Sequence, residues 1–174
     1  MPPQATSDIP QTIVLMGVCG CGKSSVGEEL VRQIGGIFED GDDFHSPEAK
    51  AKMASGVPLD DDDRKPWFAR MRKRIEEVRA TGGRYVLACS ALKAIYREWL
   101  RADDSPTELQ FVHLAGSREL IQARMDARKG HFMPPSLLDS QFATLERPND
   151  AVEVSIDQSV LEIVAETLQR LRTT

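Results

Sequence analysis

Short apolar runs alternate along the chain with longer stretches in which apolar residues recur at helical spacing. The apolar runs predict buried strands at residues 12–16, 37–39, 85–88, 109–114 and 152–156. The amphipathic stretches predict helices at residues 23–34, 64–79, 92–101, 117–128, 136–145 and 158–171. Strands and helices that alternate in this order are typical of βα units. We therefore expect a three-layer α/β domain with a parallel sheet of about five strands flanked by helices.

Polar residues indicate where some of these helices begin. Ser117 is suited to cap the helix that follows it, because its hydroxyl can accept a hydrogen bond from a free backbone N–H. The acidic run at residues 60–63 is interpreted as structural, with Asp62 or Asp63 as the cap of the helix at 64–79. Pro66 then falls near the start of that helix, where its missing N–H does no harm.

The length fits one domain. The 174 residues lie within the roughly 100–200 residues that one domain usually takes. No linker or internal repeat divides the chain. We assign residues 1–10 to a flexible lead-in and residues 11–174 to a single domain.

Composition excludes several classes of protein. The net charge of −5 argues against nucleic-acid binding, because domains of that class normally carry a basic excess. No apolar run approaches the ~18 residues of a membrane span, and the polar N-terminus has no signal-peptide core. The three cysteines form no disulfide framework, which favours a reducing compartment. We expect a cytoplasmic protein that binds neither nucleic acid nor membrane.

Residues 17–24 match the complete phosphate-loop motif G-x-x-x-x-G-K-[ST], between a predicted strand and a predicted helix. In such a loop, backbone N–H groups converge on phosphate oxygens at a helix N-terminus. Lys23 should reach the β- and γ-phosphates of ATP, and the Ser24 hydroxyl should bind Mg²⁺. The motif predicts a P-loop fold and an ATP-binding segment made of Gly17, Val18, Cys19, Gly20, Cys21, Gly22, Lys23, Ser24 and Ser25.

Two carboxylates follow the second predicted strand. Ligands of open α/β sheets bind beyond the carboxyl ends of strands, which places Asp40 and Asp42 beside the phosphate loop. Two carboxylates at this place can divide two tasks between them. We expect Asp40 to face the hydrated Mg²⁺ and Asp42 to accept a proton from a substrate hydroxyl. The alternative is a polar turn without chemistry.

The segments around and after these carboxylates resemble gluconokinases. They comprise Asp40-Gly41-Asp42, His45, residues 52–59 (KMASGVPL), 62–67 (DDRKPW), 89–93 (CSALK), 96–97 (YR), 128–133 (RKGHFM), 137–138 (LL), 140–142 (SQF) and 145–146 (LE). The similarity extends over residues 13–163 with the same order and spacing. It is far more specific than a phosphate loop alone.

The resemblance implies a shikimate-kinase-like fold and transfer of the γ-phosphoryl group of ATP to the 6-hydroxyl of D-gluconate. It also implies a homodimer. The chain departs from the usual family pattern at Ala49, where Asn is common, and at Cys19 and Cys21, where small residues such as Ser or Ala are common. Ala49 puts one polar contact in doubt. The alternatives are a kinase for shikimate or a nucleoside monophosphate, and a non-catalytic nucleotide-binding module.

Gluconate is a polyhydroxy anion, so its site needs a cation and several hydrogen-bonding groups. The candidates for the cation are Arg64, Lys93 and Arg97, and the planar guanidinium of an arginine suits a carboxylate better than an ammonium does. Lys93 and Arg97 are four residues apart and should share one face of a helix. His45 either binds a hydroxyl of gluconate or caps the next helix.

A glycine and two prolines bracket residues 129–136, which we interpret as a mobile lid. In related kinases such a lid closes over ATP and excludes water. Arg124 and Arg128 lie at the end of the preceding helix and are candidates for stabilising charge on the β- and γ-phosphates. The alternative is that they complement the dipole of the helix.

The thiols of Cys19 and Cys21 lie beside Lys23 in a loop that attracts anions. Such surroundings lower the pKa of a thiol, which would let an alkylating agent react until ATP covers the loop. The alternative is that both cysteines are small packing residues.

Overall fold

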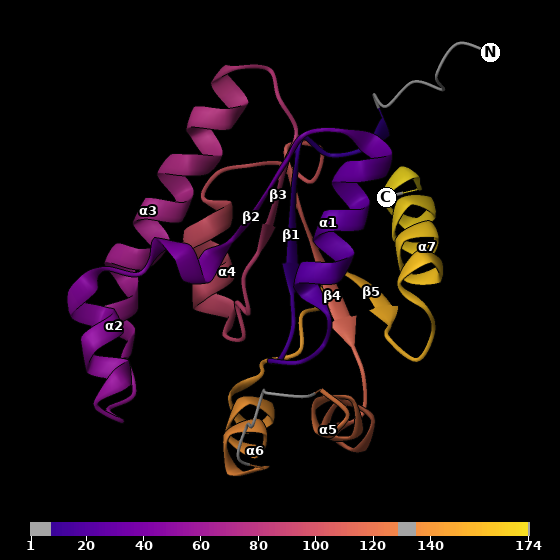
Figure 1. The fold of residues 1–174 in the computed structure, drawn as a ribbon. Coiled ribbons are helices and arrows are strands. Elements are labelled where there is room, and N and C mark those ends of the chain that lie inside the picture. The colour runs from indigo at the N-terminus through magenta and orange to yellow at the C-terminus, as the bar shows by residue number, and fades with distance from the viewer. Residues whose placement is uncertain (1–7, 129–134, 174) are drawn as a thin grey trace.

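Five strands form the centre of the structure, a computed structural model that describes residues 8–128 and 135–173. They are β1 (Thr12–Met16), β2 (Ile37–Asp40), β3 (Tyr85–Ala88), β4 (Leu109–Ala115) and β5 (Val152–Ser155). Their order in the sheet is β2-β3-β1-β4-β5, and every pairing is parallel. All carboxyl ends therefore meet at one edge of the sheet (Figure 1), as the alternation of strands and helices predicts.

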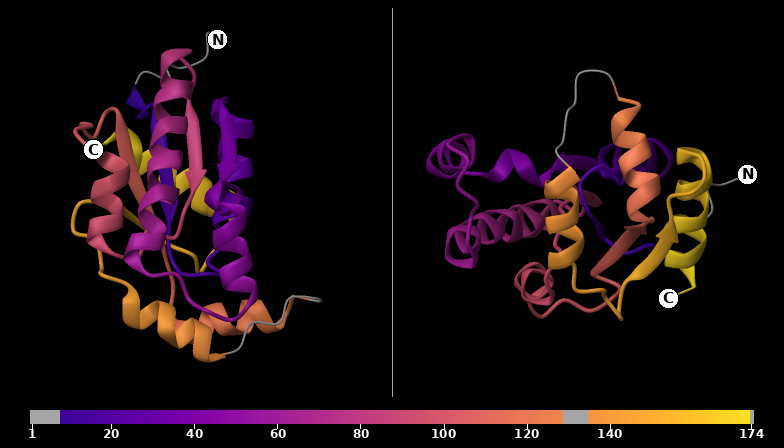
Figure 2. Two further views of the ribbon diagram at one scale, coloured as in Figure 1. Left: turned by 90° about the vertical axis from the view of Figure 1, so that its left-hand side faces the viewer. Right: turned by 90° about the horizontal axis from the view of Figure 1, so that it is seen from below.

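Helices cover both faces of the sheet (Figure 2). One face carries α1 (Lys23–Ile34) and α7 (Val160–Arg172), and the other carries α3 (Asp61–Ala80) and α4 (Ala94–Arg101). The remaining helices are α2 (Pro47–Ala54), α5 (Arg118–Asp126), α6 (Pro135–Thr144) and the short 3-10 helix η2 (Gly41–Phe44). α5 and α6 lie beyond the carboxyl ends of the strands. The predicted three-layer architecture is confirmed.

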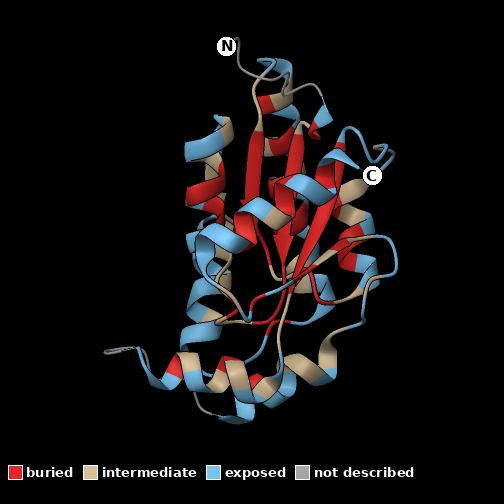
Figure 3. Ribbon diagram, turned by 90° about the vertical axis from the view of Figure 1, so that its right-hand side faces the viewer, coloured by how far each residue is buried: buried red, intermediate tan, exposed pale blue. Residues whose placement is uncertain are grey.

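The central strand β1 supplies both hydrophobic cores. Ile13 and Leu15 face the helix pair α1 and α7, whereas Val14 and Met16 face α3 and α4. All four side chains are fully buried, as the red strands between the outer layers show (Figure 3). A parallel strand that is covered on both faces has a continuous run of apolar residues, which is why this strand could be predicted from the sequence.

The start of α3 differs from the prediction. The cap of α3 is Asp60, not Asp62 or Asp63. Asp60 accepts a hydrogen bond from the N–H of Asp63, and the Asp63 carboxylate accepts one from the N–H of Asp60. This capping box starts the helix three residues earlier, so Pro66 lies inside it. Ser117 caps α5 as predicted.

Helix α2 has no counterpart among the predicted elements. None of its residues is buried, so it carries no apolar periodicity that a sequence pattern could show. It begins at Ser46, whose side chain accepts a hydrogen bond from Ala49 N, and Pro47 occupies its first turn. His45 is therefore not the cap of this helix.

The described part of the N-terminal segment is more firmly packed than a loose lead-in. Ile9 is 5% exposed and joins the core between the sheet, α1 and α7. The carbonyls of Ile9 and Pro10 accept hydrogen bonds from Arg84. Among the helices of the described residues, none has the length and apolar character needed to cross a membrane.

Candidate active site

The phosphate loop turns sharply between β1 and α1 at the carboxyl edge of the sheet. Gly17 has a φ of +145°, and a Cβ there would lie 2.8 Å from Cys21 Sγ and 2.9 Å from Leu114 O, so a side chain does not fit. Lys23 Nζ donates to the loop carbonyls of Gly17 at 2.9 Å and Val18 at 3.1 Å. The ammonium is thereby held over the loop that precedes the helix.

A first cavity, of about 280 Å³, lies over this loop. We call it the loop cavity. Its lining residues are Cys19, Gly20, Gly22, Lys23, Ser24, Ser25, Asp40, Asp42, Ala88, Cys89, Ser90, Arg128 and Gln141. Six of the nine residues predicted to bind ATP line it. Gly17, Val18 and Cys21 are buried behind it, where they shape the loop.

Asp40 organises the carboxylate side of the loop cavity. It ends β2, and its Oδ1 accepts a hydrogen bond from Asp42 N at 2.9 Å. Its Oδ2 lies 3.3 Å from Ser24 Oγ, which donates to it. The side chains predicted to serve Mg²⁺, Ser24 and Asp40, are thus in contact.

The carboxyl of Asp42 is partly enclosed although its side chain faces the cavity. Burial raises its pKa, the negative charge of Asp40 raises it further, and Lys23 opposes both effects. A carboxylate with a raised pKa is a better proton acceptor than an ordinary one.

A second cavity, of about 520 Å³, adjoins the first. We call it the acceptor cavity. It is lined by Asp42, His45, Met53, Gly56, Val57, Pro58, Leu59, Arg64, Trp67, Phe68, Ser90, Ala91, Leu92, Tyr96, Leu137, Ser140, Gln141 and Thr144. Asp42, Ser90 and Gln141 line both cavities and so form their junction.

Arg64 is the only lysine or arginine among the described residues that line the acceptor cavity. It belongs to α3, its Nε donates to Leu59 O at 3.3 Å, and its guanidinium lies 5.6 Å from the centre of the Tyr96 ring. The remaining N–H groups of its guanidinium have the planar arrangement that suits a carboxylate.

His45 forms an aromatic wall of the acceptor cavity. Its ring stacks on Trp67 with centroids 4.1 Å apart, and Trp67 Nε1 donates to Gly41 O at 2.7 Å. Burial lowers the pKa of His45, and the nearby Arg64 lowers it further, so both effects favour the neutral ring. Its buried Nδ1 has no hydrogen-bond partner in the described part of the chain.

The prediction that Lys93 and Arg97 share one helix face toward the site is wrong. Lys93 is the cap residue that precedes α4, and its ammonium pairs with Asp61 at 3.1 Å. Arg97 is 5% exposed and lies outside both cavities. Its guanidinium donates to the carbonyls of Ala91, Leu92 and Glu146, which connects α4 to the segment after α6.

The two arginines at the end of α5 also have different environments. Arg128 lines the loop cavity, as expected of a group that contacts phosphates. Arg124 lies outside it and donates to the backbone carbonyl of Ile156 and, at 3.5 Å, to that of Gln158. The predicted lid at residues 129–136 lies mostly outside the described residues, and its last two residues begin α6.

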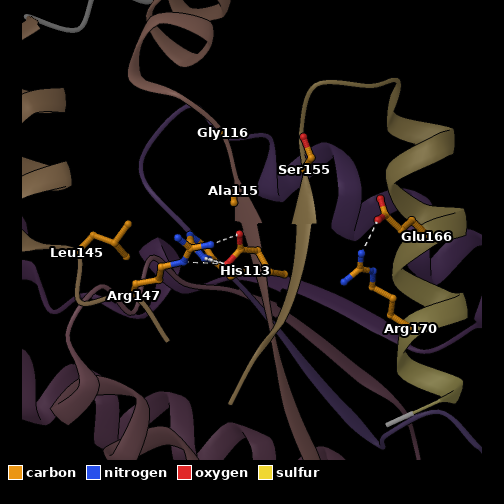
Figure 4. Close-up of a pocket in the computed structure, with 9 residues that line it drawn as sticks. His113, Ala115, Gly116, Leu145, Arg147, Ser155, Glu166 and Arg170 are labelled. Carbon is orange, nitrogen blue, oxygen red and sulfur yellow. Dashed lines mark hydrogen bonds and ion pairs between the residues drawn. The ribbon is translucent and has the colours of Figure 1, made fainter. Parts of the chain in front are cut away.

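A third cavity, of about 560 Å³, opens beside β4 and β5 (Figure 4). It contains none of the predicted site residues. Its charged groups already pair with one another, since Arg147 contacts Glu153 at 2.7 Å and Arg170 contacts Glu166 at 3.1 Å. This charge balance gives it no preference for an anionic substrate.

Comparison with known proteins agrees with this geometry. The family model described as Shikimate kinase matches residues 19–171. A probable gluconokinase from Mus musculus is 43% identical in an alignment of 183 positions that covers 95% of this chain and 100% of that protein. The chain belongs to the gluconokinase branch of the shikimate kinase family. The resemblance noted in the sequence is therefore confirmed.

Two further gluconokinases support this assignment. The gluconokinase of Gluconobacter oxydans (strain 621H) is 45% identical over 157 residues, covering 90% of this chain and 84% of that protein. A crystal structure of a gluconokinase from Sinorhizobium meliloti 1021 has 46% identity and a TM-score of 0.84, with 95% of this chain and 93% of that chain covered. The chain is a kinase of this family over nearly its whole length.

The cysteines of this gluconokinase-family loop do not have the environment that the sequence suggested. Burial raises the pKa of Cys19, and this effect outweighs the opposing charge of Lys23. Cys21 is fully buried in the core. The hypothesis of a lowered thiol pKa at Cys19 is wrong, and the packing alternative describes Cys21. Ala49 lines neither cavity.

Three residues of the site were not recognised in the sequence. Ser90 follows β3, Tyr96 lies on α4, and Gln141 lies on α6. Ser90 could have been found from its position just beyond a strand end, where ligands bind. Helical periodicity does not distinguish Gln141 or Tyr96 from other helical residues, but both lie in segments that carry the family resemblance (96–97 and 140–142), and that signal could have found them.

Proposed function

We propose that the chain transfers the γ-phosphoryl group of ATP to the 6-hydroxyl of D-gluconate. The observation that carries this proposal is the junction at Asp42, where a phosphate-loop cavity meets a separate cavity whose described lining contains a single arginine and no lysine. A kinase needs such an arrangement, because the nucleotide and the acceptor must meet in line while water is kept out. The family assignment supports gluconate as the acceptor.

The acceptor cavity fits a polyhydroxy acid. Arg64 supplies a charge-assisted, two-point contact for the carboxylate. The neutral His45 and the junction residues Asp42, Ser90 and Gln141 offer donors and acceptors for hydroxyl groups. Lys93 and Arg97, the other candidates for the carboxylate, already pair with groups of the chain itself.

Asp42 is assigned to the hydroxyl that receives the phosphoryl group. Phosphoryl transfer passes through a loose transition state, so orientation of the hydroxyl matters more than its early deprotonation. The Asp42 carboxylate orients the hydroxyl and takes its proton as the new bond forms. Lys23 and Arg128 stabilise the charge on the phosphates.

The side chains of Ser24 and Asp40 in the loop cavity suit Mg²⁺. Ser24 Oγ and Asp40 Oδ2 are hard oxygen ligands, and Mg²⁺ usually takes only one or two protein oxygens besides phosphate and water. The described residues contain no cluster of three or more His, Cys, Asp or Glu that could hold a metal alone. When bound, Mg²⁺ would neutralise phosphate charge.

The test is acceptor-dependent release of ADP, measured with gluconate, shikimate and a nucleoside monophosphate. Turnover with gluconate, and formation of 6-phosphogluconate by mass spectrometry, supports the proposal. Slow ATP hydrolysis that no acceptor stimulates would instead indicate a nucleotide-binding module. We also propose a homodimer, which light scattering can test, and a cytoplasmic location, which fractionation of the source cells can test.

A further inference from the structure

Helix α6 contacts the phosphate loop through one side chain. Gln141 Oε1 accepts a hydrogen bond from the backbone N–H of Cys19 at 2.5 Å. Two residues in the turn before Gln141 fix the helix. Leu138 is fully buried in the core, and Asp139 pairs with Arg118 of α5. The Gln141 side chain therefore extends from a firmly anchored helix.

The contact determines which way the amide points. A backbone N–H only donates, so the atom of Gln141 that faces Cys19 must be the carbonyl oxygen. The NH₂ group of Gln141 then points away from the loop N–H. Within the described residues it has no acceptor, although it can donate two hydrogen bonds.

The position of Gln141 places this NH₂ group where it can donate to a bound hydroxyl. Gln141 lines both the loop cavity and the acceptor cavity, together with Asp42 and Ser90. The Asp42 carboxylate can only accept hydrogen bonds, whereas the amide of Gln141 donates them. A hydroxyl group between the two can donate its proton to Asp42 and accept from Gln141.

We propose that Gln141 is a further catalytic residue, whose amide donates to the acceptor oxygen that attacks phosphorus. One lone pair of that oxygen accepts from Gln141, and the other forms the bond to the γ-phosphorus. The O–H proton passes to Asp42, while the bond between the γ-phosphorus and ADP breaks and its electrons leave with ADP. The Cys19 N–H keeps the amide in this orientation.

This inference rests on the proposed function, and its test compares Gln141→Ala with Gln141→Glu. Both remove the donating NH₂, but Glu keeps an oxygen that can accept from Cys19. We expect kcat with gluconate to fall about tenfold or more in both variants, the equivalent of one lost hydrogen bond. The dissociation constant of a non-hydrolysable ATP analogue should stay within about twofold, because the phosphates do not depend on the lost donor. Gln169→Glu makes the same change on an exposed face of α7 and should behave as the wild type.

Three outcomes overturn the inference. Normal turnover in Gln141→Ala means that the amide contributes nothing to transfer. Normal turnover in Gln141→Glu alone means that Gln141 only holds the loop. Tighter binding of the ATP analogue with unchanged kcat means that the side chain merely fills a phosphate position. Weaker binding of the ATP analogue to Gln141→Glu but not to Gln141→Ala indicates repulsion by the new carboxylate. The kcat of Gln141→Ala then decides whether the amide takes part in transfer. If the wild type itself does not phosphorylate gluconate, the proposed function has failed instead.

Discussion

Asp40 holds Asp42 by accepting a hydrogen bond from its backbone N–H at 2.9 Å. The first carboxylate thereby fixes the chain at the point where the second enters both cavities. It also raises the pKa of Asp42, after the larger effect of burial. One residue thus controls the position and the charge of the group assigned to the acceptor hydroxyl.

Replacing Asp42 by Asn should abolish most activity while ATP binding persists. Asn keeps the size of the side chain but cannot take the proton of the hydroxyl. Gluconate-dependent ADP release and the dissociation constant of an ATP analogue measure the two effects separately. Wild-type kcat in this variant would refute the role of Asp42.

The pH dependence of kcat/KM should report the raised pKa of Asp42. Activity is lost as the pH falls through that pKa, because the protonated carboxyl no longer accepts a proton. Asp40→Asn keeps an oxygen for the Asp42 N–H but removes the neighbouring negative charge. The acid limb should therefore move to lower pH, and the Mg²⁺ requirement should increase. An acid limb that does not move would contradict the coupling between the two carboxyls.

Lys23→Ala should lower kcat/KM by at least ~100-fold, the typical cost of one preorganised charge at a transition state. Lys23 Nζ donates to the carbonyls of Gly17 and Val18 within the loop itself, so its loss leaves both cores intact. Thermal unfolding monitored by circular dichroism provides the control. Near-normal turnover with normal thermal stability would exclude the lysine from the mechanism.

Arg64 and Arg97 should respond differently to the same conservative change to Lys. In Arg64→Lys the planar contact with the gluconate carboxylate is lost, so KM for gluconate should rise about tenfold with little change in stability. In Arg97→Lys three backbone carbonyls lose their donor, so the melting temperature should fall. Steady-state kinetics and calorimetry on both variants test this contrast. A raised KM in Arg97→Lys and a lower melting temperature in Arg64→Lys would mean that Arg97 binds gluconate and Arg64 stabilises the fold.

Asp104 should dominate the acid sensitivity of the fold. Burial alone would raise its pKa, but hydrogen bonds from Arg79 and Arg72 outweigh this effect and lower the pKa to about 2 from 3.8. The folded state therefore gains about 2 kcal/mol from this carboxylate at neutral pH. That gain is lost as the pH falls from about 4 toward 2, since the folded pKa lies below the unfolded one. Urea unfolding of wild type and Asp104→Asn across this range should show the difference between them shrinking.

The sequence predicts those parts of the fold whose signal is local. A buried parallel strand such as β1 gives a continuous apolar run, and the phosphate loop has a fixed spacing of glycines. Helix α2 lacks such a signal because none of its side chains is buried. The start of α3 was missed because four consecutive acids offer several equivalent caps, and only the reciprocal bonds of Asp60 and Asp63 distinguish them.

The candidate site, too, was predicted only where its signal is local. Lys23, Asp42 and Arg64 follow from motifs, and the structure places them in the two cavities. The four-residue spacing of Lys93 and Arg97 misleads, because α4 begins only after Lys93. Gln141 belongs to the SQF segment of the family resemblance, but its contact with the phosphate loop could not be predicted, since it joins residues 122 positions apart in the chain.

Among the described residues, the two cavities share only three, and this has a consequence for how such kinases diverge. Most of the acceptor wall comes from α2 and the loop that follows it, the start of α3, and α6, which lie outside the sheet that supports the phosphate loop. Substitutions there can accumulate without disturbing ATP use. Preference for a new hydroxy acid can therefore evolve in small steps, provided that Asp42, Ser90 and Gln141 stay in place.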